Sequence, residues 1–407
     1  MVPFPFGGTV RYDRLAAHFH TLRRTRLSRP FAWIIQELTH LESHKNNIGL
    51  LRLLFASLVI IGHAPEMMDG NRSHEPLTMI FHSLSLGELS VDAFFLLSGY
   101  LITRSMIGTG SLSRYLERRV LRIYPAFIVA YLLSVFVLGP FVHAQPWMEL
   151  PSTFLRLVML KNPMSYPGQL PGLFYPDLNG AMWTISYEFR CYLLIGALGV
   201  LGLLTCRKSM IFLTALAIVS SIIATFPFAW WRLEALGGCE PVELLFGDPS
   251  STLRLTTIFM VGTCFYLFRN EIGAWLNGTA ATICGLAAAA LMYRNPHFAE
   301  AALTSFGAVS LFWIAFRVRL GPLQKINDKW DISYGVYLYG WPVATCIRWL
   351  QPSMSSWVLA ATTLPIAYAF GASSWWGLEK WAKDWVRSRS VYKTGSGVIN
   401  DTSSTSV

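Results

Sequence analysis

Long apolar segments recur along almost the whole chain after residue 47, and they limit the folds that it can adopt. Each is about 17–23 residues long, the length at which an α-helix crosses the hydrocarbon core of a bilayer. Only 14% of the 407 residues are charged and 53% are hydrophobic, whereas about a quarter of a soluble domain is charged. The segments are too continuous for an outer-membrane barrel, whose strands alternate over about ten residues. The sequence therefore predicts an all-α polytopic membrane protein.

Ten transmembrane helices can be placed on these segments. They are expected near residues 49–65, 86–106, 121–142, 182–204, 209–229, 253–269, 272–292, 299–318, 331–350 and 356–377. Lysine and arginine are concentrated in alternate connections, which is the positive-inside pattern of cytoplasmic loops. This alternation predicts ten helices with both termini in the cytoplasm.

Three regions follow from this placement. Residues 1–47 form a basic cytoplasmic extension, residues 48–380 the transmembrane domain, and residues 381–407 a cytoplasmic tail that is expected to be disordered at its end. The extension lacks the short apolar core and cleavage site of a signal peptide, and its 31–41 stretch is expected to be an amphipathic surface helix.

Charge and cysteine content exclude two classes of partner. The net charge of +10 does not indicate nucleic acid, because the basic residues fall between apolar segments. The six cysteines are widely spaced without a CxxC pair, so we expect neither a disulfide framework nor a metal site. Two long external connections, 143–180 and 230–251, are rich in aromatic or acidic residues; they suit either sugar binding or an interfacial aromatic belt.

The first apolar segment carries two ionisable residues, Arg52 and His63. Eleven residues are three helical turns plus a small remainder, so both side chains lie on roughly one face, about 16 Å apart along the axis. If Arg52 lies at one membrane interface, His63 reaches the membrane interior. Desolvation favours the neutral imidazole, which is the state that a general base needs.

Other polar residues interrupt later apolar segments. Asp92 lies within the second span, where Ser98 and Gly99 form a small patch that a helix or a ligand can approach. The segment after this span carries three arginines at positions i, i+1 and i+4, which can clamp a phosphate or simply anchor the cytoplasmic side. They are Arg118, Arg119 and Arg122.

The fourth span carries Glu188 and Arg190. Two residues apart on a helix is nearly opposite, so the two side chains need other partners. A glutamate within a membrane is a functional candidate, and its alternative is a structural ion pair that locks helices together.

These residues fall in five motifs that occur in one order. They are Arg52-x10-His63, Ser90-Val-Asp-Ala-Phe-Phe-Leu-Leu-Ser-Gly-Tyr-Leu-Ile102, Arg118-Arg-Val-Leu-Arg-Ile-Tyr-Pro125, Trp183-Thr-Ile-Ser-Tyr-Glu188 and Ile332-Ser-Tyr-Gly-Val-Tyr-Leu338. With these five motifs in this order, the chain resembles the membrane-bound acyltransferase 3 family of bacterial O-acyltransferases. Members of that family act on surface polysaccharides, exopolysaccharides and Nod factors. The ninth span departs from the family, because Tyr339-Gly-Trp-Pro342 stands where many members carry a histidine.

The resemblance implies a ten-helix domain in a bacterial inner (cytoplasmic) membrane that transfers an acetyl or other acyl group from cytoplasmic acyl-CoA to a sugar hydroxyl. Arg52, Arg118, Arg119 and Arg122 would bind the CoA phosphates, and Ser98, Trp183 and Tyr187 would contact substrate. His63 would act as the general base, with Asp92 or Glu188 orienting it. A covalent acetyl-histidine intermediate is a variant of this mechanism.

Two other classes use the same residues differently. A transporter or flippase for a lipid-linked sugar or a small anion would use them as a charged relay, although the two halves show no paired short or broken spans. A non-catalytic membrane scaffold would not need Arg52, His63 and Glu188 together.

Overall fold

The computed structural model describes residues 46–165, 174–229, 231, 235, 243, 245–328, 330–382 and 384–385. Within these residues the regular elements are helices, and one isolated β-bridge joins Ser165 and Asp177. The longer helices are α3 (Ile48–Asp69), α5 (Leu86–Thr109), α6 (Leu112–Leu133), α9 (Trp183–Val200), α10 (Arg207–Ala224), α13 (Pro249–Leu267), α15 (Gly278–Arg294), α18 (Ser333–Leu350) and α19 (Ser356–Ser374). The shorter helices are α4 (Pro76–Phe81), α7 (Gly139–Phe141), α8 (Leu150–Val158), α14 (Arg269–Trp275), α16 (Pro296–Ala302) and α17 (Ala308–Phe316).

Three π-helical turns join or extend these helices. Ser134–Leu138 joins α6 to α7, Leu303–Gly307 joins α16 to α17, and Trp375–Glu379 extends α19. The helical backbone continues without a break through each of these turns. The helices that they join therefore form long membrane segments.

Several helices are long and apolar enough to cross a membrane. In the described part of the chain they number five, or six if α13 and α14, which meet at 85°, form one broken span. The five are Ile48–Asp69, Leu86–Thr109, Leu112–Phe141, Arg207–Ala224 and Pro296–Phe316. The expected all-α, multi-pass architecture is therefore confirmed, while the count of ten crossings and the orientation stay predictions.

Each of the ten expected segments falls on a helix, but the ends differ. The third begins at Leu112 rather than at residue 121, so the three clustered arginines lie on α6 itself. The seventh begins at Gly278, because Asn277 accepts a hydrogen bond from the Ala280 amide and caps α15 there. Residues 269–275 form the separate helix α14.

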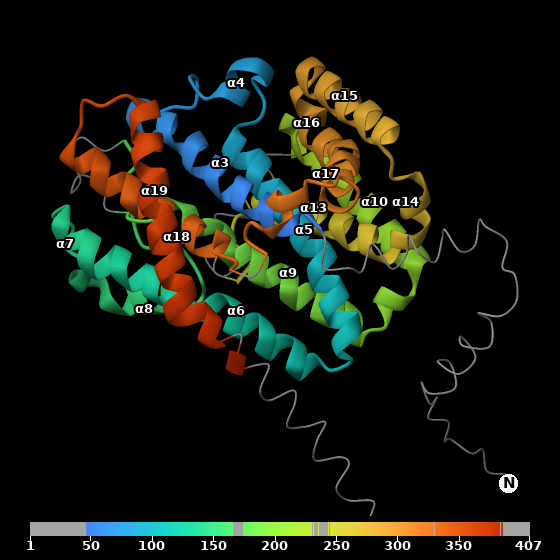
Figure 1. Ribbon diagram of the computed structural model, residues 1–407, viewed down its shortest axis with the longest axis horizontal. Coiled ribbons are helices and arrows are strands. Elements are labelled where there is room, and N and C mark those ends of the chain that lie inside the picture. Colours follow the sequence, from blue (N-terminus) through green and yellow to red (C-terminus); the bar gives the residue numbers. More distant parts are fainter. Residues whose placement is uncertain are drawn as a thin grey trace, which may run out of the picture. The chain divides into compact units, whose positions relative to one another are not determined.

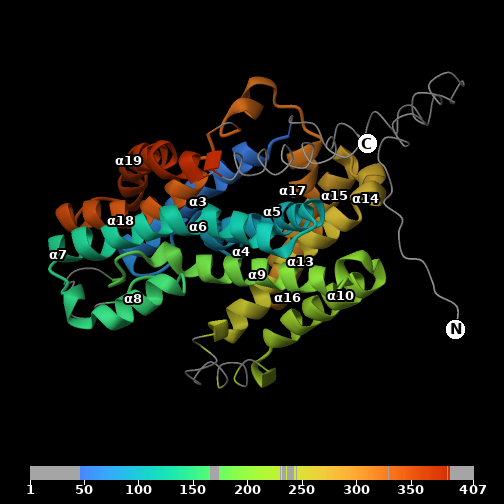
Figure 2. The same cartoon turned by 90° about the horizontal axis from the view of Figure 1, so that it is seen from below.

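Close helix crossings hold the centre of this unit together. Figure 1 shows α3 and α5 at the centre, with α18 and α19 on one side and α13 to α17 on the other. Figure 2, the view from below, shows the same grouping. At Gly99 and Gly262 the backbones of α5 and α13 leave no room for a Cβ atom, which confirms that the small patch of the second span receives another helix.

Expectations for some segments concern residues outside the described ranges. They are the basic extension before residue 46 with its amphipathic helix at 31–41, the tail after residue 385, and most of the 230–244 connection.

Candidate active site

His63 pairs with Glu66, one helical turn further along α3. The His63 Nδ1 atom lies 2.9 Å from the Glu66 Oε2 atom, and Glu66 is buried. With Nδ1 donating to the carboxylate, Nε2 is the nitrogen that can accept a proton. The Nε2 side of the ring lies next to Gly87 of α5, where a Cβ atom would be 3.9 Å from Nε2.

Glu66 is itself held by a basic residue. Arg72 Nε lies 3.1 Å from Glu66 Oε2, and Arg72 Nη1 lies 3.1 Å from Glu88 Oε1 at the start of α5. The loop after α3 is thereby tied to α5, and the carboxylate that faces His63 keeps its orientation. We call this end of the helices the His63 end.

Trp341 packs against the other side of the imidazole. Its ring meets the His63 ring edge-on, with centroids 5.0 Å apart. The indole N–H donates to the Asp177 carbonyl oxygen over 2.9 Å, and Gly180 allows the ring to approach closely. Trp341 comes from the Tyr339-Gly-Trp-Pro342 stretch where this chain departs from the family pattern.

The structure corrects one expectation about His63. Neither Asp92 nor Glu188 is its carboxylate partner, because Glu66 occupies that position. Asp92 is buried and instead pairs with Arg254 of α13, whose Nε lies 3.1 Å from Glu300 Oε1. The close crossing of α5 and α13 brings this arginine within reach of Asp92.

Glu188 lies in a polar contact between α5 and α9. Its Oε1 atom accepts hydrogen bonds from Ser98 Oγ at 2.8 Å and from the Tyr192 hydroxyl at 2.6 Å. Within the described residues Glu188 forms no salt bridge, so the alternative of a structural ion pair finds no support there.

Glu188 and Arg52 line one small cavity of about 40 Å³. Its other walls come from α5, α9 and α18: Val91, Phe94, Phe95, Thr184, Ile185, Ser333, Tyr334 and Tyr337. A space of this size is large enough to admit water. Two predicted site residues, one cationic and one anionic, are therefore brought together between the helices.

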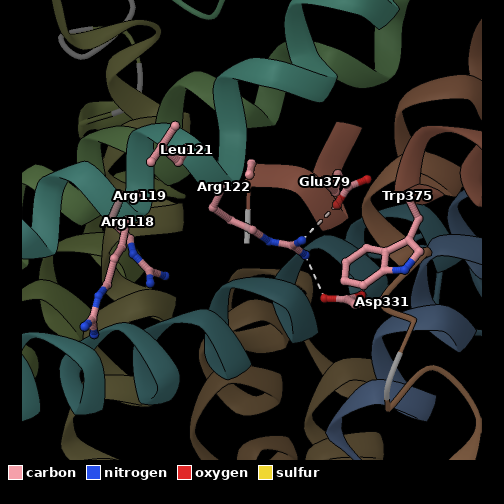
Figure 3. Close-up of a pocket in the computed structure, with 8 residues that line it drawn as sticks. Arg118, Arg119, Leu121, Arg122, Asp331, Trp375 and Glu379 are labelled. Atoms are coloured by element: carbon pink, nitrogen blue, oxygen red, sulfur yellow. Dashed lines mark hydrogen bonds and ion pairs between the residues drawn. The ribbon is translucent and has the colours of Figure 1, made fainter. Parts of the chain in front are cut away.

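A larger cavity of about 340 Å³ opens at the other end of α3. Figure 3 shows Arg122 reaching across it to two carboxylates, with Arg118 and Arg119 lying apart on one side. Arg122 contacts Asp331 at 2.7 Å and Glu379 at 2.9 Å. We call this the Arg122 end.

Asp331 lies between the two cavities. Its Oδ2 atom lies 2.5 Å from Arg52 Nη1 and also binds Arg122. Its other oxygen accepts from Ser333 Oγ at 2.5 Å and from Asn327 Nδ2 at 3.2 Å. Because Arg52 lines the small cavity and Asp331 the large one, this ion pair forms the boundary between them.

Arg118 and Arg119 carry charge without a carboxylate partner among the described residues. Arg118 Nη1 donates to Thr109 Oγ1 at 3.3 Å. The Arg119 guanidinium lies 5.8 Å from the centre of the Tyr192 ring, and its buried Nε has no hydrogen-bond acceptor. Both line the large cavity, so they are the arginines there that are ready to receive an anion.

Trp183 and Tyr187 lie on another face of α9. Their rings meet edge-on with centroids 5.6 Å apart, and the Tyr187 hydroxyl accepts from the Asp248 amide at 2.9 Å. Tyr187 thereby contacts the connection before α13, and no described contact joins either ring to His63.

Sequence reasoning missed three residues that complete these sites: Glu66, Asp331 and Trp341. Glu66 carried a usable signal, because it follows His63 at the i, i+3 spacing that brings side chains together on a helix. The partners of Asp331 come from α3 and α6, and Trp341 meets His63 across two helices, so neither contact can be read from local spacing.

The fold and these contacts describe a multi-pass membrane enzyme with an oriented histidine at one end and clustered arginines at the other. The chain belongs to the acyltransferase 3 family: the family's sequence profile, described as an acyltransferase domain, matches residues 45–378. It is therefore an acyltransferase. Within the described residues no group of three or more His, Cys, Asp or Glu side chains is arranged to hold a metal ion.

Named relatives agree with this class. The chain is 25% identical over 315 residues to the O-acetyl transferase of Shigella phage Sf6, covering 74% of this chain and 85% of the relative. It is 26% identical over 329 residues to Nodulation protein 10 of Rhizobium leguminosarum bv. viciae, covering 74% and 83%. No solved structure matches the chain significantly.

Proposed function

We propose that this acyltransferase moves an acetyl group from acetyl-CoA to a hydroxyl of a carbohydrate, and that His63 is the general base. The observation that carries the proposal is the His63–Glu66 pair, with Nδ1 held by a carboxylate and Nε2 facing the space beside Gly87. A histidine held in this way is the arrangement of base and orienting carboxylate found in catalytic triads.

The chemistry follows from this geometry. The acceptor oxygen attacks the thioester carbonyl carbon while Nε2 takes the hydroxyl proton. Glu66 stabilises the resulting imidazolium, whose second N–H it already accepts. When the tetrahedral intermediate collapses, the carbon–sulfur bond breaks and the imidazolium returns the proton to the CoA sulfur. Direct transfer of this kind requires no acetyl-histidine intermediate.

The donor is proposed to enter at the Arg122 end, which the charge pattern assigns to the cytoplasm, with both termini on that side and ten membrane crossings. Arg118 and Arg119 would meet the CoA phosphates first, because Asp331 and Glu379 already neutralise Arg122. Arg52 lies deeper between the helices, on the other side of Asp331 from Arg122. The arm carrying the acetyl group would then pass the small cavity. Val91 in the wall of this cavity is one turn of α5, about 6 Å, from Gly87, the residue beside His63 Nε2.

The acceptor is proposed to be a sugar of a surface or exported polysaccharide, reached from the His63 end. The printed name of the phage relative, O-acetyl transferase, supports acetyl transfer to oxygen. A bacterial inner membrane would then hold the enzyme with its acceptor side facing out.

The test compares His63→Ala with the wild type in membranes that contain equal amounts of each protein. Incorporation of labelled acetyl from acetyl-CoA into polysaccharide, and the acetyl content of the surface polysaccharide, are measured. We expect His63→Ala to lower the rate by about 10²–10⁴-fold, the range that a general base contributes. His74→Ala is the matched control, because His74 also pairs with a carboxylate at this end but is exposed. Acetyl transfer that survives in His63→Ala would contradict the assignment.

The second candidate is a transporter or flippase for a lipid-linked sugar or a small anion. The bent pair α13 and α14 is the feature that favours it, because broken helices are common at transporter sites. Unchanged acetyl content together with a glycolipid that accumulates on one side of the membrane would select this class.

A further inference from the structure

Three basic side chains gather at the His63 end without an ion-paired carboxylate in the described part of the chain. Arg156 lies in the last turn of α8, Lys161 in the connection that follows, and Arg190 on α9. Arg156 Nη1 donates to the Asn162 carbonyl oxygen at 3.3 Å, and Lys161 Nζ donates to the Glu243 carbonyl oxygen at 3.2 Å.

Two other arginines at this end are held by carboxylates. Arg72 is bound by Glu66 and Glu88, and Arg254 by Asp92 and Glu300. Positive charge is disfavoured on the outer side of a membrane protein, so three cations gathered there without carboxylates form a candidate site for an anionic ligand.

Hydrogen bonds place Lys161 beside the other two cations. The Lys161 amide donates to the Arg156 carbonyl oxygen at 2.9 Å, and Lys161 Nζ shares the Glu243 carbonyl oxygen with the amide of Gly247, which lies against Arg190. Burial lowers the pKa of Lys161, repulsion from Arg156 and Arg190 lowers it further, and the exposed Glu243 opposes the shift. An anion placed among them would remove this repulsion.

Arg190 packs against Tyr187 and Gly247. Its guanidinium lies 5.0 Å from the centre of the Tyr187 ring, and its buried Nη1 has no hydrogen-bond acceptor. Gly247 and the Tyr187 hydroxyl lie against this nitrogen, since a Cβ atom at Gly247 would be 2.7 Å from it, so a ligand would have to reach Arg190 on the partly exposed side of its side chain. Buried donors without acceptors are uncommon, because each one forfeits the hydrogen bond that it made in water.

The surroundings of the cluster are suited to lipid. Helix α8 and the turn before it expose large apolar side chains, which are Met148, Leu150, Phe154, Leu155 and Val158. A short helix with an exposed apolar face and a basic last turn is typical of a segment lying in the membrane interface. A ligand bound there has phosphate at the level of the cations and apolar chain beside α8.

We infer that Arg156, Lys161 and Arg190 form a binding site for the phosphate of a lipid-anchored molecule. Trp183 and Tyr187 precede Arg190 on α9 at i, i+4 and i+7 spacing, so they share a face with it. A sugar attached to the bound phosphate would meet these two rings. Given the proposed acetyl transfer to a carbohydrate, this site anchors a lipid-linked phosphosugar as the acceptor.

Binding is measured by native mass spectrometry on the full-length protein in a neutral detergent, so no acetyl transfer is needed. The probes are geranylgeranyl diphosphate, dioleoyl phosphatidic acid and inorganic pyrophosphate. The variants are Lys161→Gln and Arg190→Gln, with Arg190→Lys as the charge-preserving variant. Arg294→Gln is the matched control, because Arg294 is an exposed arginine at the end of α15, on the same predicted side of the membrane.

We expect a lipid phosphate to bind the wild type and Arg294→Gln alike, and to bind Lys161→Gln and Arg190→Gln about tenfold or more weakly, with Arg190→Lys retaining most of the affinity. Tighter binding of geranylgeranyl diphosphate than of phosphatidic acid identifies a lipid-linked acceptor. Equal binding of the two lipids identifies a site for a lipid headgroup. Full displacement of either lipid by pyrophosphate identifies a site for a free anion. The inference is overturned if no probe binds the wild type, or if both glutamine variants bind as tightly as Arg294→Gln. His63 takes no part in this binding assay. A failure to bind the probes can therefore be distinguished from a failure of the proposed acetyl transfer.

Discussion

His63 and Glu66 lie one turn apart on α3, so a single helix supplies both the proposed base and the group that orients it. Their spacing is fixed by that helix, whereas the orientation of the carboxylate is tied to α5. That orientation depends on Arg72, whose contacts with Glu66 and Glu88 hold the carboxylate in place.

Glu66→Gln tests the orienting role. The amide retains the size of the side chain but cannot stabilise an imidazolium, so we expect the acetyl-transfer rate to fall about 10²-fold while the KM for acetyl-CoA changes little. Initial rates in membranes give both values. Asp69→Asn is the control, since Asp69 pairs with His74 at the surface and its loss should leave the rate unchanged. An equal fall in the two variants would argue against a specific role for Glu66.

Gly87→Ala tests whether the acceptor uses the space beside Nε2. The added Cβ makes only ordinary contacts, 3.8 Å to Ser85 Oγ and 3.9 Å to His63 Nε2, so the protein should fold. Replacing a helical glycine by alanine should stabilise α5 by about 0.5–1 kcal/mol. We expect the KM for the acceptor to rise while thermal stability holds or improves. Unchanged acceptor kinetics would place the acceptor elsewhere.

At the scale of one helix, α6 carries the three clustered arginines. Arg119→Gln should raise the KM for acetyl-CoA about tenfold, because it removes a charge-assisted contact to phosphate, and should weaken the dependence of KM on salt. Arg114→Gln is the matched control, since Arg114 is exposed in the first turn of α6 and does not line the large cavity. Equal effects in both variants would point to general membrane anchoring.

The crossing of α5 and α13 makes a second prediction at this scale. A methyl group at Gly99 would meet the Phe259 carbonyl oxygen, so Gly99→Ala should force the helices apart and cost about 1–3 kcal/mol of stability. Gly108→Ala, on the same helix with open space around it, should not lower stability. Thermal unfolding of the two purified variants in detergent gives the comparison. Loss of the crossing should also displace Arg254 from Asp92.

For the whole molecule, the orientation in the membrane can be tested with single cysteines. In a background without the six native cysteines, a cysteine at His74 should react with an impermeant maleimide in intact cells, because the 70–75 connection is predicted to face outward. A cysteine restored at position 206, which is exposed, should react only after the cells are permeabilised. The reverse pattern would invert the proposed direction of transfer.

The sequence predicted the all-helical multi-pass fold well, because uninterrupted apolar segments admit few other structures in a bilayer. It also predicted that Arg118, Arg119 and Arg122 gather at one place, since their spacing on a helix is local. The sequence could not predict the partner of Asp92, because Arg254 is distant in sequence and the pairing depends on how α13 crosses α5.

The small cavity between Arg52 and Glu188 has a consequence for the cell as well as for the reaction. A protein open to both sides of an energised membrane would dissipate the proton gradient if water and ions could pass through it. Phe94 and Tyr337 of the cavity wall pack edge-on, with ring centroids 6.0 Å apart, beside a space of about 40 Å³. On the proposed route the acyl group would have to displace these two rings, so insulation against ions and passage of the acyl group would depend on the same two aromatic side chains.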